Sequence, residues 1–187
     1  MGDGSDKPKV LVFAGPNGSG KTTVARSLSQ FATYINADDL KKEYGLTYLE
    51  AAQMAESLRT HLLDKGADFS FETVLSTERN LRLLEKAKTY GYEVQCIYVL
   101  TCDENINVAR VKARQAAGGH GVPEEKVRAR YHRALALLPK LISVCDNILV
   151  YDNSDMPSLV YRKEKTYSEI IPNNHWPEAE LKILLAL

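Results

Sequence analysis

The sequence has no net charge and no long hydrophobic run. Its 187 residues include 24 Lys or Arg and 24 Asp or Glu, so the formal charge at pH 7 is zero. A balanced charge argues against a bulk nucleic-acid binder and against a polybasic membrane-surface protein. No stretch approaches the roughly 18 apolar residues that a membrane-spanning helix needs. We therefore expect neither a nucleic acid nor a membrane as a partner.

Signals for secretion and for disulfides are lacking as well. The first residues, MGDGSDKPK, are polar and have no apolar core of the kind that a secretory signal contains. We expect residues 1–8 to be a disordered leader. The three cysteines, Cys96, Cys102 and Cys145, are an odd number with no C-x-x-C pair, which favours reduced thiols in a cytoplasmic protein. A catalytic thiol would need a nearby base that the sequence does not reveal.

What the sequence does contain is the composition of an ordinary folded domain. Hydrophobic residues make up 44% and charged residues 26%, close to the averages for soluble globular proteins. The length suits one domain with a full core, and there is no internal repeat, low-complexity segment or interdomain linker. We expect a single domain in which residues 154–187 form a C-terminal extension.

Apolar runs and helical patterns alternate along the chain. Strands are predicted at residues 9–14, 33–36, 68–72, 93–100 and 147–151, with a further edge strand at 159–162. Helices are predicted at residues 21–30, 38–44, 48–65, 77–90, 103–117, 123–138 and 177–187. This alternation indicates a mostly parallel sheet of five or six strands with helices on both faces. Because ligands bind beyond the carboxyl ends of such strands, the residues that follow each strand are the first candidates for a site.

A phosphate-binding loop follows the first predicted strand. Its residues are Gly15, Pro16, Asn17, Gly18, Ser19, Gly20, Lys21 and Thr22, followed by Thr23. They satisfy G-x-x-x-x-G-K-[ST] between a strand and a helix, the context that this motif requires. Glycines let backbone N–H groups converge on phosphate oxygens, Lys21 is expected to reach the β and γ phosphates, and Thr22 is expected to place its hydroxyl on Mg²⁺. The sequence therefore predicts the α/β three-layer sandwich of a nucleotide-kinase-like P-loop NTPase, with ATP and Mg²⁺ as cofactors.

Carboxylates follow the next two predicted strands. Asp38 and Asp39 come after the strand at 33–36. A carboxylate here could accept a proton from a substrate hydroxyl, for which Asp38 is the preferred candidate, while Asp39 is a candidate N-cap of the next helix. Glu72 ends the third strand and could assist Mg²⁺ or bind substrate hydroxyls. The alternative interpretation is that all three are solvated turn, cap or strand-end residues.

Basic residues are concentrated in one later segment. Residues 107–133 contain seven Lys or Arg and two Glu. Arg110 and Arg114 share a helix face because they are four residues apart, and the segment GGHGVP at 118–123 separates them from a second basic helix. That helix carries Arg128, Arg130 and Arg133. Two basic helices joined by a glycine-rich hinge are typical of a lid that closes over phosphates, although they could also be two solvated faces.

The loop after the fifth strand completes the set of candidates. It contains Asn153, and a loop in this position often cradles the adenine in P-loop kinases. We therefore expect Asn153, together with Arg110, to contribute to the nucleotide site.

These motifs together resemble the zeta toxin family of P-loop kinases. The resemblance rests on GPNGSGKTT at 15–23, NADDL at 36–40, FSFET at 69–73, RVKAR at 110–114, GGHGVP at 118–123 and RYHRAL at 130–135. The motifs lie in the family's order over roughly residues 9–153. The chain looks most similar to the short, often solitary branch described as predicted ATPases or kinases.

The resemblance implies ATP-dependent phosphorylation of a sugar hydroxyl on UDP-N-acetylglucosamine, and an antitoxin protein as a partner. It implies that Lys21 and Thr22 hold ATP and Mg²⁺ and that Asp38 is the general base. It also implies that Glu72, with its neighbour Thr73, binds the substrate.

For the arginines, the resemblance implies that Arg114 stabilises the transferred phosphoryl group. A second such arginine of the family falls near His120 in this sequence, which departs from the family there. His120, Arg110 or an arginine within 128–133 is therefore a candidate to replace it, and His120 is a candidate substrate-binding residue.

The motifs are also compatible with three other functions. The loop GPNGSGKTT also occurs in transporter-type ATPases that couple hydrolysis to motion. Those proteins need a serine-glycine-glycine signature followed by an apolar strand that ends in Asp-Glu, whereas GGHGVP is followed here by a charged helix. The chain could also be a kinase for another small hydroxyl substrate, or a nucleotide-binding interaction module held by an antitoxin.

Overall fold

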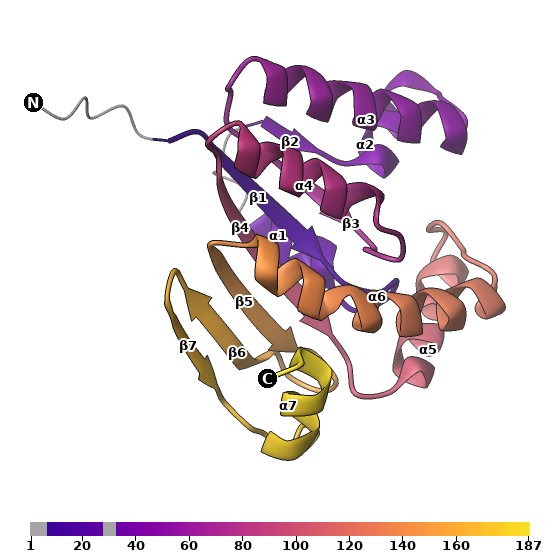
Figure 1. Ribbon diagram of the computed structural model, residues 1–187. Helices are drawn as coiled ribbons and strands as arrows, with labels where there is room; N and C mark the ends of the chain where they lie inside the picture. The colour runs from indigo at the N-terminus through magenta and orange to yellow at the C-terminus, as the bar shows by residue number, and fades with distance from the viewer. Residues whose placement is uncertain (1–6, 28–32) are drawn as a thin grey trace, which may run out of the picture.

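The computed structural model describes residues 7–27 and 33–187, which fold around one central sheet (Figure 1). Within these ranges the sheet has seven strands in the order β2-β3-β1-β4-β5-β6-β7. The parallel strands are β2 (Thr33–Ile35), β3 (Phe69–Thr73), β1 (Lys9–Ala14), β4 (Glu93–Leu100) and β5 (Asn147–Asp152). Two antiparallel strands, β6 (Ser158–Glu164) and β7 (Tyr167–Ile170), extend the sheet beyond β5. The predicted mostly parallel α/β fold is confirmed, but within the described residues the sheet has seven strands in place of the five or six predicted.

Helices connect the strands as the alternating pattern predicts. They are α1 (Lys21–Ser27), α2 (Ala37–Tyr44), α3 (Tyr48–Asp64), α4 (Arg79–Thr89), α5 (Glu104–Ala116), α6 (Glu124–Val144) and α7 (Glu178–Leu185). The expected leader falls largely on residues 1–6, and the end of the helix predicted at 21–30 falls on residues 28–32; both lie outside the described residues. In the part of the chain that the structure describes, no helix is both long and apolar enough to cross a membrane.

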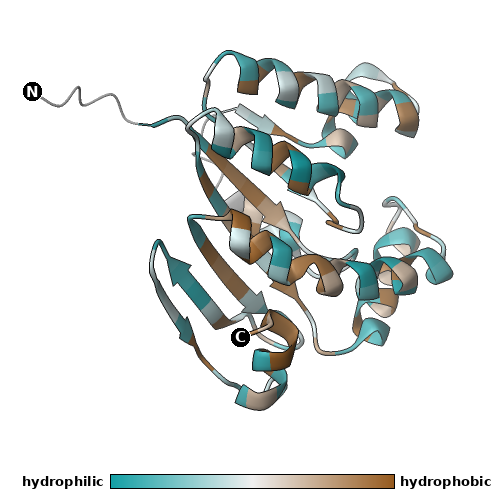
Figure 2. Ribbon diagram, in the orientation of Figure 1, coloured by the Kyte–Doolittle hydropathy of each residue, from teal (hydrophilic) through white to brown (hydrophobic). Residues whose placement is uncertain are grey.

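Strand β1 explains why the core has two halves. Val10 and Val12 point to one face of the sheet, where they join the core formed with α3, α4, α6 and α7. Leu11 and Phe13 point to the opposite face, where Ala25 of α1 packs against them. A continuous apolar run suits a strand that is covered on both sides, and Figure 2 shows the hydrophobic central strands behind helices with hydrophilic outer faces. This packing fixes the carboxyl end of β1 at the middle of the sheet edge.

Two predictions about individual elements were wrong, one about the end of a helix and one about the edge of the sheet. The helix predicted to end at residue 138 continues as α6 to Val144, through Pro139. Proline removes one backbone donor from a helix, but Leu141 and Ile142 beyond it are buried in the core, and this burial holds the last turns in helical form. The strand predicted at 159–162 is not an edge strand, because β7 pairs with it. Strand β7 was missed because it has only four residues, YSEI, of which two are exposed and none is fully buried.

Candidate active site

The phosphate loop occupies the carboxyl end of β1 and leads directly into α1. Gly15 has φ of 134°, and a Cβ atom there would lie 2.0 Å from the carbonyl oxygen of Val99 on β4. Gly20 has φ of 103°, and a Cβ atom there would lie 2.4 Å from the Nδ2 atom of Asn153. Glycine is required at both positions because other residues rarely adopt these angles and because no space exists for a side chain.

Two asparagine side chains hold the phosphate loop, one from α5 and one from the end of β5. The fully buried Asn107, on α5, donates from Nδ2 to the carbonyl oxygen of Asn17 at 2.6 Å. Asn153, directly after β5, donates from Nδ2 to the carbonyl oxygen of Ser19 at 2.7 Å. These bonds fix two carbonyl groups of the loop and thereby hold the turn in which backbone N–H groups can face an anion. Asn107 was not predicted from the sequence, because a buried asparagine on a helix has no local signature.

Arg110 fixes the position of Asn153. Its two terminal nitrogens donate to the carbonyl oxygens of Asn153 at 2.7 Å and of Ser154 at 3.0 Å. Arg110 also lines the cavity in front of the phosphate loop. The expected nucleotide-side residues Arg110 and Asn153 are therefore adjacent and support each other.

Lys21 is a buried cation at the start of α1. Its side chain donates from Nζ to the carbonyl oxygen of Pro16 at 2.8 Å, inside the loop. Burial lowers the pKa of Lys21 to about 8; nearby Glu72 and Asp38 oppose the shift, whereas Arg114 adds to it. A bound polyphosphate would restore the charged form, because an anion at hydrogen-bond distance favours the ammonium.

Asp38 lines the same cavity as Lys21. Asn36 is the N-cap of α2, and its Oδ1 atom accepts a hydrogen bond from the backbone N–H of Asp38 at 2.8 Å. The prediction that Asp39 caps this helix is therefore wrong: both aspartates lie in the first turn, where the positive helix end favours negative charge. Asp38 is exposed to solvent and lines the cavity.

Glu72 is held by two hydroxyl groups. Thr22 donates from Oγ1 to Glu72 Oε2 at 3.0 Å, and the hydroxyl of Tyr34 donates to Glu72 Oε1. Asn36 in turn donates from Nδ2 to the Tyr34 oxygen at 3.1 Å. Burial, together with the hydrogen bond to Glu72, raises the pKa of the Tyr34 hydroxyl well above its usual value, so this hydroxyl remains a donor. Tyr34 was not predicted as a site residue, although it lies two positions before Asn36 on a predicted strand.

The donor atoms beside the phosphate loop fit a magnesium ion that binds through phosphates. Thr22 and Glu72 present hydroxyl and carboxylate oxygens within 3.0 Å of each other, and oxygen is the ligand that Mg²⁺ prefers. Among the described residues there is no cluster of three or more His, Cys, Asp or Glu that could hold a metal alone. This combination is typical of Mg²⁺ sites that use one carboxylate and the phosphates of a substrate.

The predicted residues converge on one cavity of about 470 Å³. The phosphate loop, the acceptor-side carboxylates and the basic helices each form a wall. Its lining includes Asn17, Gly18, Gly20, Lys21, Thr22, Thr23, Asp38, Glu72, Thr73, Arg110, Arg114, His120 and Arg130. A neighbouring cavity of about 930 Å³ shares Thr22, Asp38, Arg114 and His120 with it and extends along Lys41, Lys42 and Tyr48.

Four predicted residues have a supporting place in the structure. Gly15, Pro16 and Ser19 are buried in the turn of the phosphate loop. Thr73 reaches the cavity wall, and its Oγ1 atom accepts hydrogen bonds from Leu75 N at 3.0 Å and Asn80 Nδ2 at 2.8 Å. The Thr73 hydroxyl thereby shapes the turn that follows β3.

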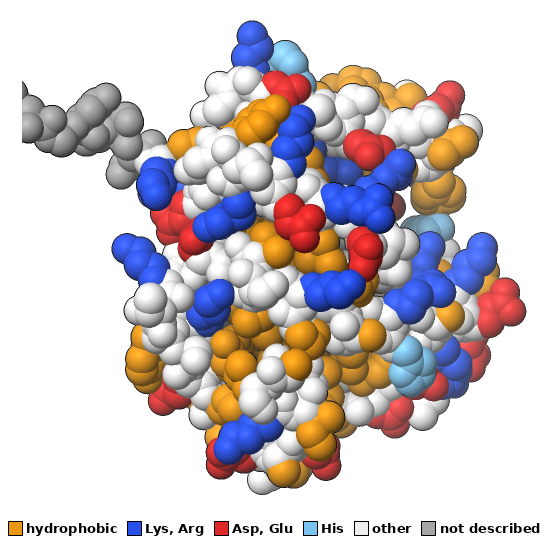
Figure 3. Space-filling model, viewed as in Figure 1, with side chains coloured by type: hydrophobic (Ala, Val, Ile, Leu, Met, Phe, Trp, Pro, Cys, Tyr) orange, Lys and Arg blue, Asp and Glu red, His pale blue; other side chains and the backbone are white. Residues whose placement is uncertain are grey.

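The basic segment divides into residues that face the cavity and residues that do not. Arg130 donates to the Oδ1 atom of Asn17 at 3.4 Å, and Arg114 donates from Nε to the carbonyl oxygen of His120 at 3.1 Å. His120 reaches across to α3, where its Nδ1 atom lies 2.6 Å from the Tyr48 hydroxyl. Figure 3 shows Lys and Arg side chains gathered beside the hollow near α5 and α6.

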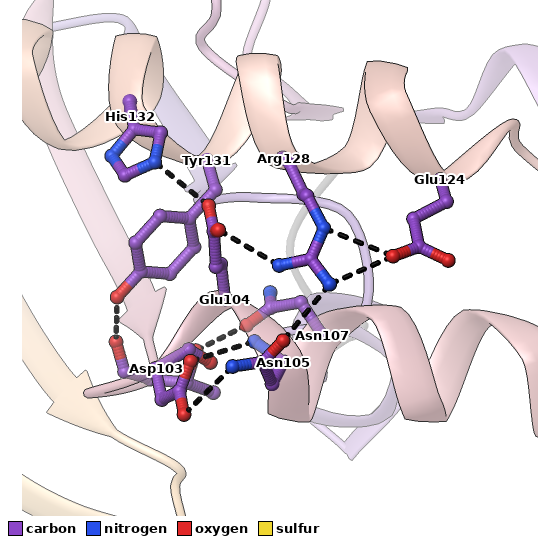
Figure 4. A network of polar contacts seen from close by, with 9 residues as sticks. Asp103, Glu104, Asn105, Asn107, Glu124, Arg128, Tyr131 and His132 are labelled. Carbon is purple, nitrogen blue, oxygen red and sulfur yellow. Dashed lines mark hydrogen bonds and ion pairs between the residues drawn. The ribbon is translucent and has the colours of Figure 1, made fainter.

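Arg128 serves a different purpose. It forms ion pairs with Glu104 at 2.8 Å and Glu124 at 2.7 Å and a hydrogen bond with Asn105, as Figure 4 shows. These contacts tie α6 to the start of α5, and Arg128 does not line the cavity. Arg133 does not line it either. Of the candidates for the second phosphate-stabilising group, Arg110, Arg130 and His120 are therefore the ones that the structure brings to the cavity.

The fold and the site define a nucleotide-binding kinase: a phosphate loop with a buried lysine faces carboxylates across one cavity. The family model of the zeta toxins matches residues 30–166, which is more than half of the chain. The chain belongs to the zeta toxin family.

Two curated proteins are similar in sequence. An uncharacterized protein of Haemophilus influenzae is 32% identical over 130 residues, which cover 66% of this chain and 92% of that protein. A cytidylate kinase of Sulfurisphaera tokodaii is 30% identical over 123 residues, which cover 63% of this chain and 66% of the kinase. This chain therefore spans just under two thirds of the cytidylate kinase.

Two solved structures share the fold. A chain of the PezAT toxin-antitoxin system of Streptococcus pneumoniae has a TM-score of 0.62 and 23% identity, with 98% of this chain and 85% of that chain covered. A chain of the AvrRxo1-ORF1:AvrRxo1-ORF2 complex with sulphate ions has a TM-score of 0.73 and 14% identity, with 97% of this chain and 64% of that chain covered. Because these sequence identities are low, the two structural similarities establish only the fold.

Proposed function

We propose that this kinase transfers the γ-phosphoryl group of ATP to a hydroxyl group of a nucleotide sugar such as UDP-N-acetylglucosamine. The observation that carries the proposal is that Lys21, Asp38 and Glu72 line one cavity, and that a second cavity of about 930 Å³ shares Asp38 and other lining residues with it. The second cavity has the size of a site for a small-molecule ligand. An ATPase that uses water as its acceptor needs no such space.

The donor half of the site binds the triphosphate. Backbone N–H groups of the loop and the Lys21 ammonium contact phosphate oxygens. Thr22 and Glu72, whose oxygens lie 3.0 Å apart, hold Mg²⁺, which when bound neutralises charge on the phosphates. Arg114 and Arg130 line the cavity on the side of the basic helices and stabilise the charge that spreads over the transferred group. A structure of the AvrRxo1-ORF1:-ORF2 complex that contains ATP supports ATP as the donor.

The acceptor half of the site uses Asp38. Its carboxylate takes the proton from the acceptor hydroxyl as the hydroxyl oxygen bonds to the γ phosphorus. The bond from the γ phosphorus to the bridging oxygen breaks at the same centre, and ADP leaves with that oxygen. This carboxylate is exposed to solvent at the first turn of α2, where an acceptor hydroxyl can approach it.

The chemistry of the second cavity supports an anionic acceptor with a ring. Lys41 and Lys42 line it together with Tyr48, and the Lys41 ammonium lies 4.6 Å from the centre of the Tyr48 ring. Ammonium groups bind phosphates, and an aromatic ring can stack on a base or cover a sugar. A nucleotide sugar offers both features.

A protein partner is part of the proposal. The solved PezAT structure comes from a toxin-antitoxin system, and this likeness supports an antitoxin protein that binds the present chain. Coexpression with a neighbouring small gene product, followed by a measurement of growth with and without it, tests this part separately.

The proposed reaction is tested by mass spectrometry of a metabolite pool incubated with the protein, ATP and Mg²⁺. The pool contains UDP-sugars, nucleosides and nucleoside monophosphates. A new UDP-sugar species that is heavier by one phosphoryl group supports the proposal. Formation of ADP with no phosphorylated product contradicts it. If only a nucleoside or a nucleotide is phosphorylated, the proposed acceptor is wrong. The Asp38→Asn variant serves as the inactive control.

A further inference from the structure

A thiol, an imidazole and a carboxylate meet outside the kinase cavities. Cys102 directly follows β4, Asp155 lies in the loop after β5, and His175 lies in the loop before α7. The Cys102 sulfur is 3.6 Å from His175 Nδ1, and His175 Nε2 is 2.7 Å from Asp155 Oδ2. Three separate segments thus bring together a nucleophile, a base and a group that orients the base, which is the arrangement found in activated thiol sites.

The hydrogen bonds assign the proton positions on His175. The carboxylate of Asp155 can only accept, so it takes the Nε2–H bond, and the lone pair of Nδ1 then faces the thiol. His175 can remove the Cys102 proton to give a thiolate beside an imidazolium, and Asp155 stabilises the resulting positive charge. The thiolate is the reactive form of cysteine.

The other two cysteines provide an internal contrast. Cys96 and Cys145 are each only 2% exposed, whereas Cys102 is partly exposed. Burial, together with the hydrogen bond to Cys145, raises the pKa of the Cys96 thiol well above its usual value. The burial of Cys96 and the raised pKa of its thiol therefore both disfavour a reaction there.

We propose that Cys102 is a modification site at which a hydroperoxide oxidises the thiol to a sulfenic acid. The thiolate sulfur attacks the terminal oxygen of the peroxide, an S–O bond forms and the O–O bond breaks. The leaving alkoxide or hydroxide takes the proton from the His175 imidazolium. Sulfur is oxidised by two electrons and the peroxide is reduced by two, so no further reactant is needed.

The oxidised site connects to the nucleotide side of the kinase. The backbone N–H of Cys102 donates to Ser154 Oγ at 2.8 Å, and the Ser154 carbonyl accepts from Arg110 at 3.0 Å. The preceding residue, Asn153, holds the phosphate loop at Ser19. An added oxygen on Cys102 displaces His175 and shifts this loop, and so weakens ATP binding.

The test uses the intact protein with hydrogen peroxide at pH 7 and dimedone to trap sulfenic acid. Peptide mass spectrometry then measures the rate at each cysteine. We expect Cys102 to react at least ten times faster than Cys96 or Cys145. We expect His175→Gln to slow the reaction at Cys102 by about tenfold and Asp155→Asn to slow it less, whereas His61→Gln, at an exposed histidine on α3, leaves it unchanged.

Two results overturn the proposal. Equal rates at Cys102 in the parent and His175→Gln proteins show that exposure alone governs the reaction. An ATP dissociation constant that is unchanged after complete oxidation of Cys102 shows that the site is not connected to the nucleotide loop. Peroxide should raise this constant severalfold in the parent protein and leave it unchanged in Cys102→Ser. Since the side chain of His175 is partly exposed and that of Asp155 is largely exposed, their variants should fold, and circular dichroism checks this directly.

Discussion

The two halves of the active site differ in how firmly the structure holds them. On the donor side, Asn107 is fully buried and Lys21 is 9% exposed, and both side chains donate to carbonyl groups of the phosphate loop. On the acceptor side, Asp38 is exposed, and the contact between Tyr48 and His120 joins two exposed side chains. Buried hydrogen bonds hold a geometry that water cannot displace, whereas exposed ones compete with water. We therefore expect a preformed nucleotide site and an acceptor site whose substitutions leave ATP binding intact.

The largest effect is expected for Lys21→Ala. Removal of the ammonium takes away charge stabilisation of the transferred group, so turnover should fall by about 10³-fold, the size seen when one such group is lost. Stability at pH 7 should not fall, because burial lowers the pKa of Lys21 to about 8 in the folded protein and the charged form therefore opposes folding below that pH. A steady-state assay and a thermal melt made in parallel separate the two effects; a variant that melts normally and retains full turnover would be inconsistent with this role.

Asn153→Ala should weaken ATP binding by about tenfold, because the buried carbonyl of Ser19 loses its donor at a cost of ~1.4 kcal/mol. The acceptor side should not respond, so the Michaelis constant for the acceptor at saturating ATP should stay within twofold. Isothermal titration with ATP measures the first quantity. Asn174→Ala, at an exposed asparagine, is the matched control. A change in the Michaelis constant for the acceptor with an unchanged ATP affinity would contradict the placement of Asn153 on the donor side.

The pH dependence of ATP binding reports on the same lysine. The pKa of Lys21 is about 8 in the free protein, and bound triphosphate favours the charged form. Above pH 8, ATP binding must therefore be accompanied by uptake of a proton. The ATP affinity should then decrease with pH, approaching a tenfold decrease for each pH unit. Between pH 7 and pH 9 the dissociation constant should rise roughly tenfold, whereas Lys21→Ala should show no such slope. A constant affinity in the parent protein over this range would refute the assignment.

Tyr34→Phe should have the smallest effect and should act through Glu72. The hydroxyl of Tyr34 donates to Glu72, which also accepts from Thr22. Loss of one hydrogen bond of this kind is worth about 0.5–1.5 kcal/mol, so the Mg²⁺ concentration for half-maximal activity should rise severalfold. ATP binding without Mg²⁺ should stay unchanged. Tyr44→Phe, which removes an exposed hydroxyl of α2, provides the comparison, and an identical Mg²⁺ response in both variants would rule out a positioning role for Tyr34.

The sequence predicted the phosphate loop itself but not the residues that support it, for a physical reason. The phosphate loop is a local motif, since its glycines, Lys21 and Thr22 lie within eight consecutive residues. Asn107 supports that loop from 90 residues away in the chain, and such a contact depends on the packing of α5 against the sheet. Asp39 was assigned the cap that belongs to Asn36 because both residue types are good caps and the helix begins earlier than its apolar pattern suggests.

The basic segment shows the same limit. Its composition predicts a cationic wall, and Arg110, Arg114 and Arg130 do line the cavity. Arg128 has the same charge and lies on the same helix as Arg130, yet it pairs with Glu104 and Glu124. Only the rotation of α6 relative to α5 decides which arginines face the phosphates, and this rotation comes from burial of apolar residues such as Val108, Val111 and Val127 between the two helices.

The central claim is that Asp38 acts on the acceptor while the phosphate loop binds ATP independently of it. The most direct measurement compares ATP binding and phosphoryl transfer in the Asp38→Asn variant with the parent protein. We expect an ATP dissociation constant within twofold of the parent value and transfer reduced by at least 10²-fold, the size of a general-base contribution. Equal loss of binding and transfer in a folded variant, or transfer at the parent rate, would contradict the account.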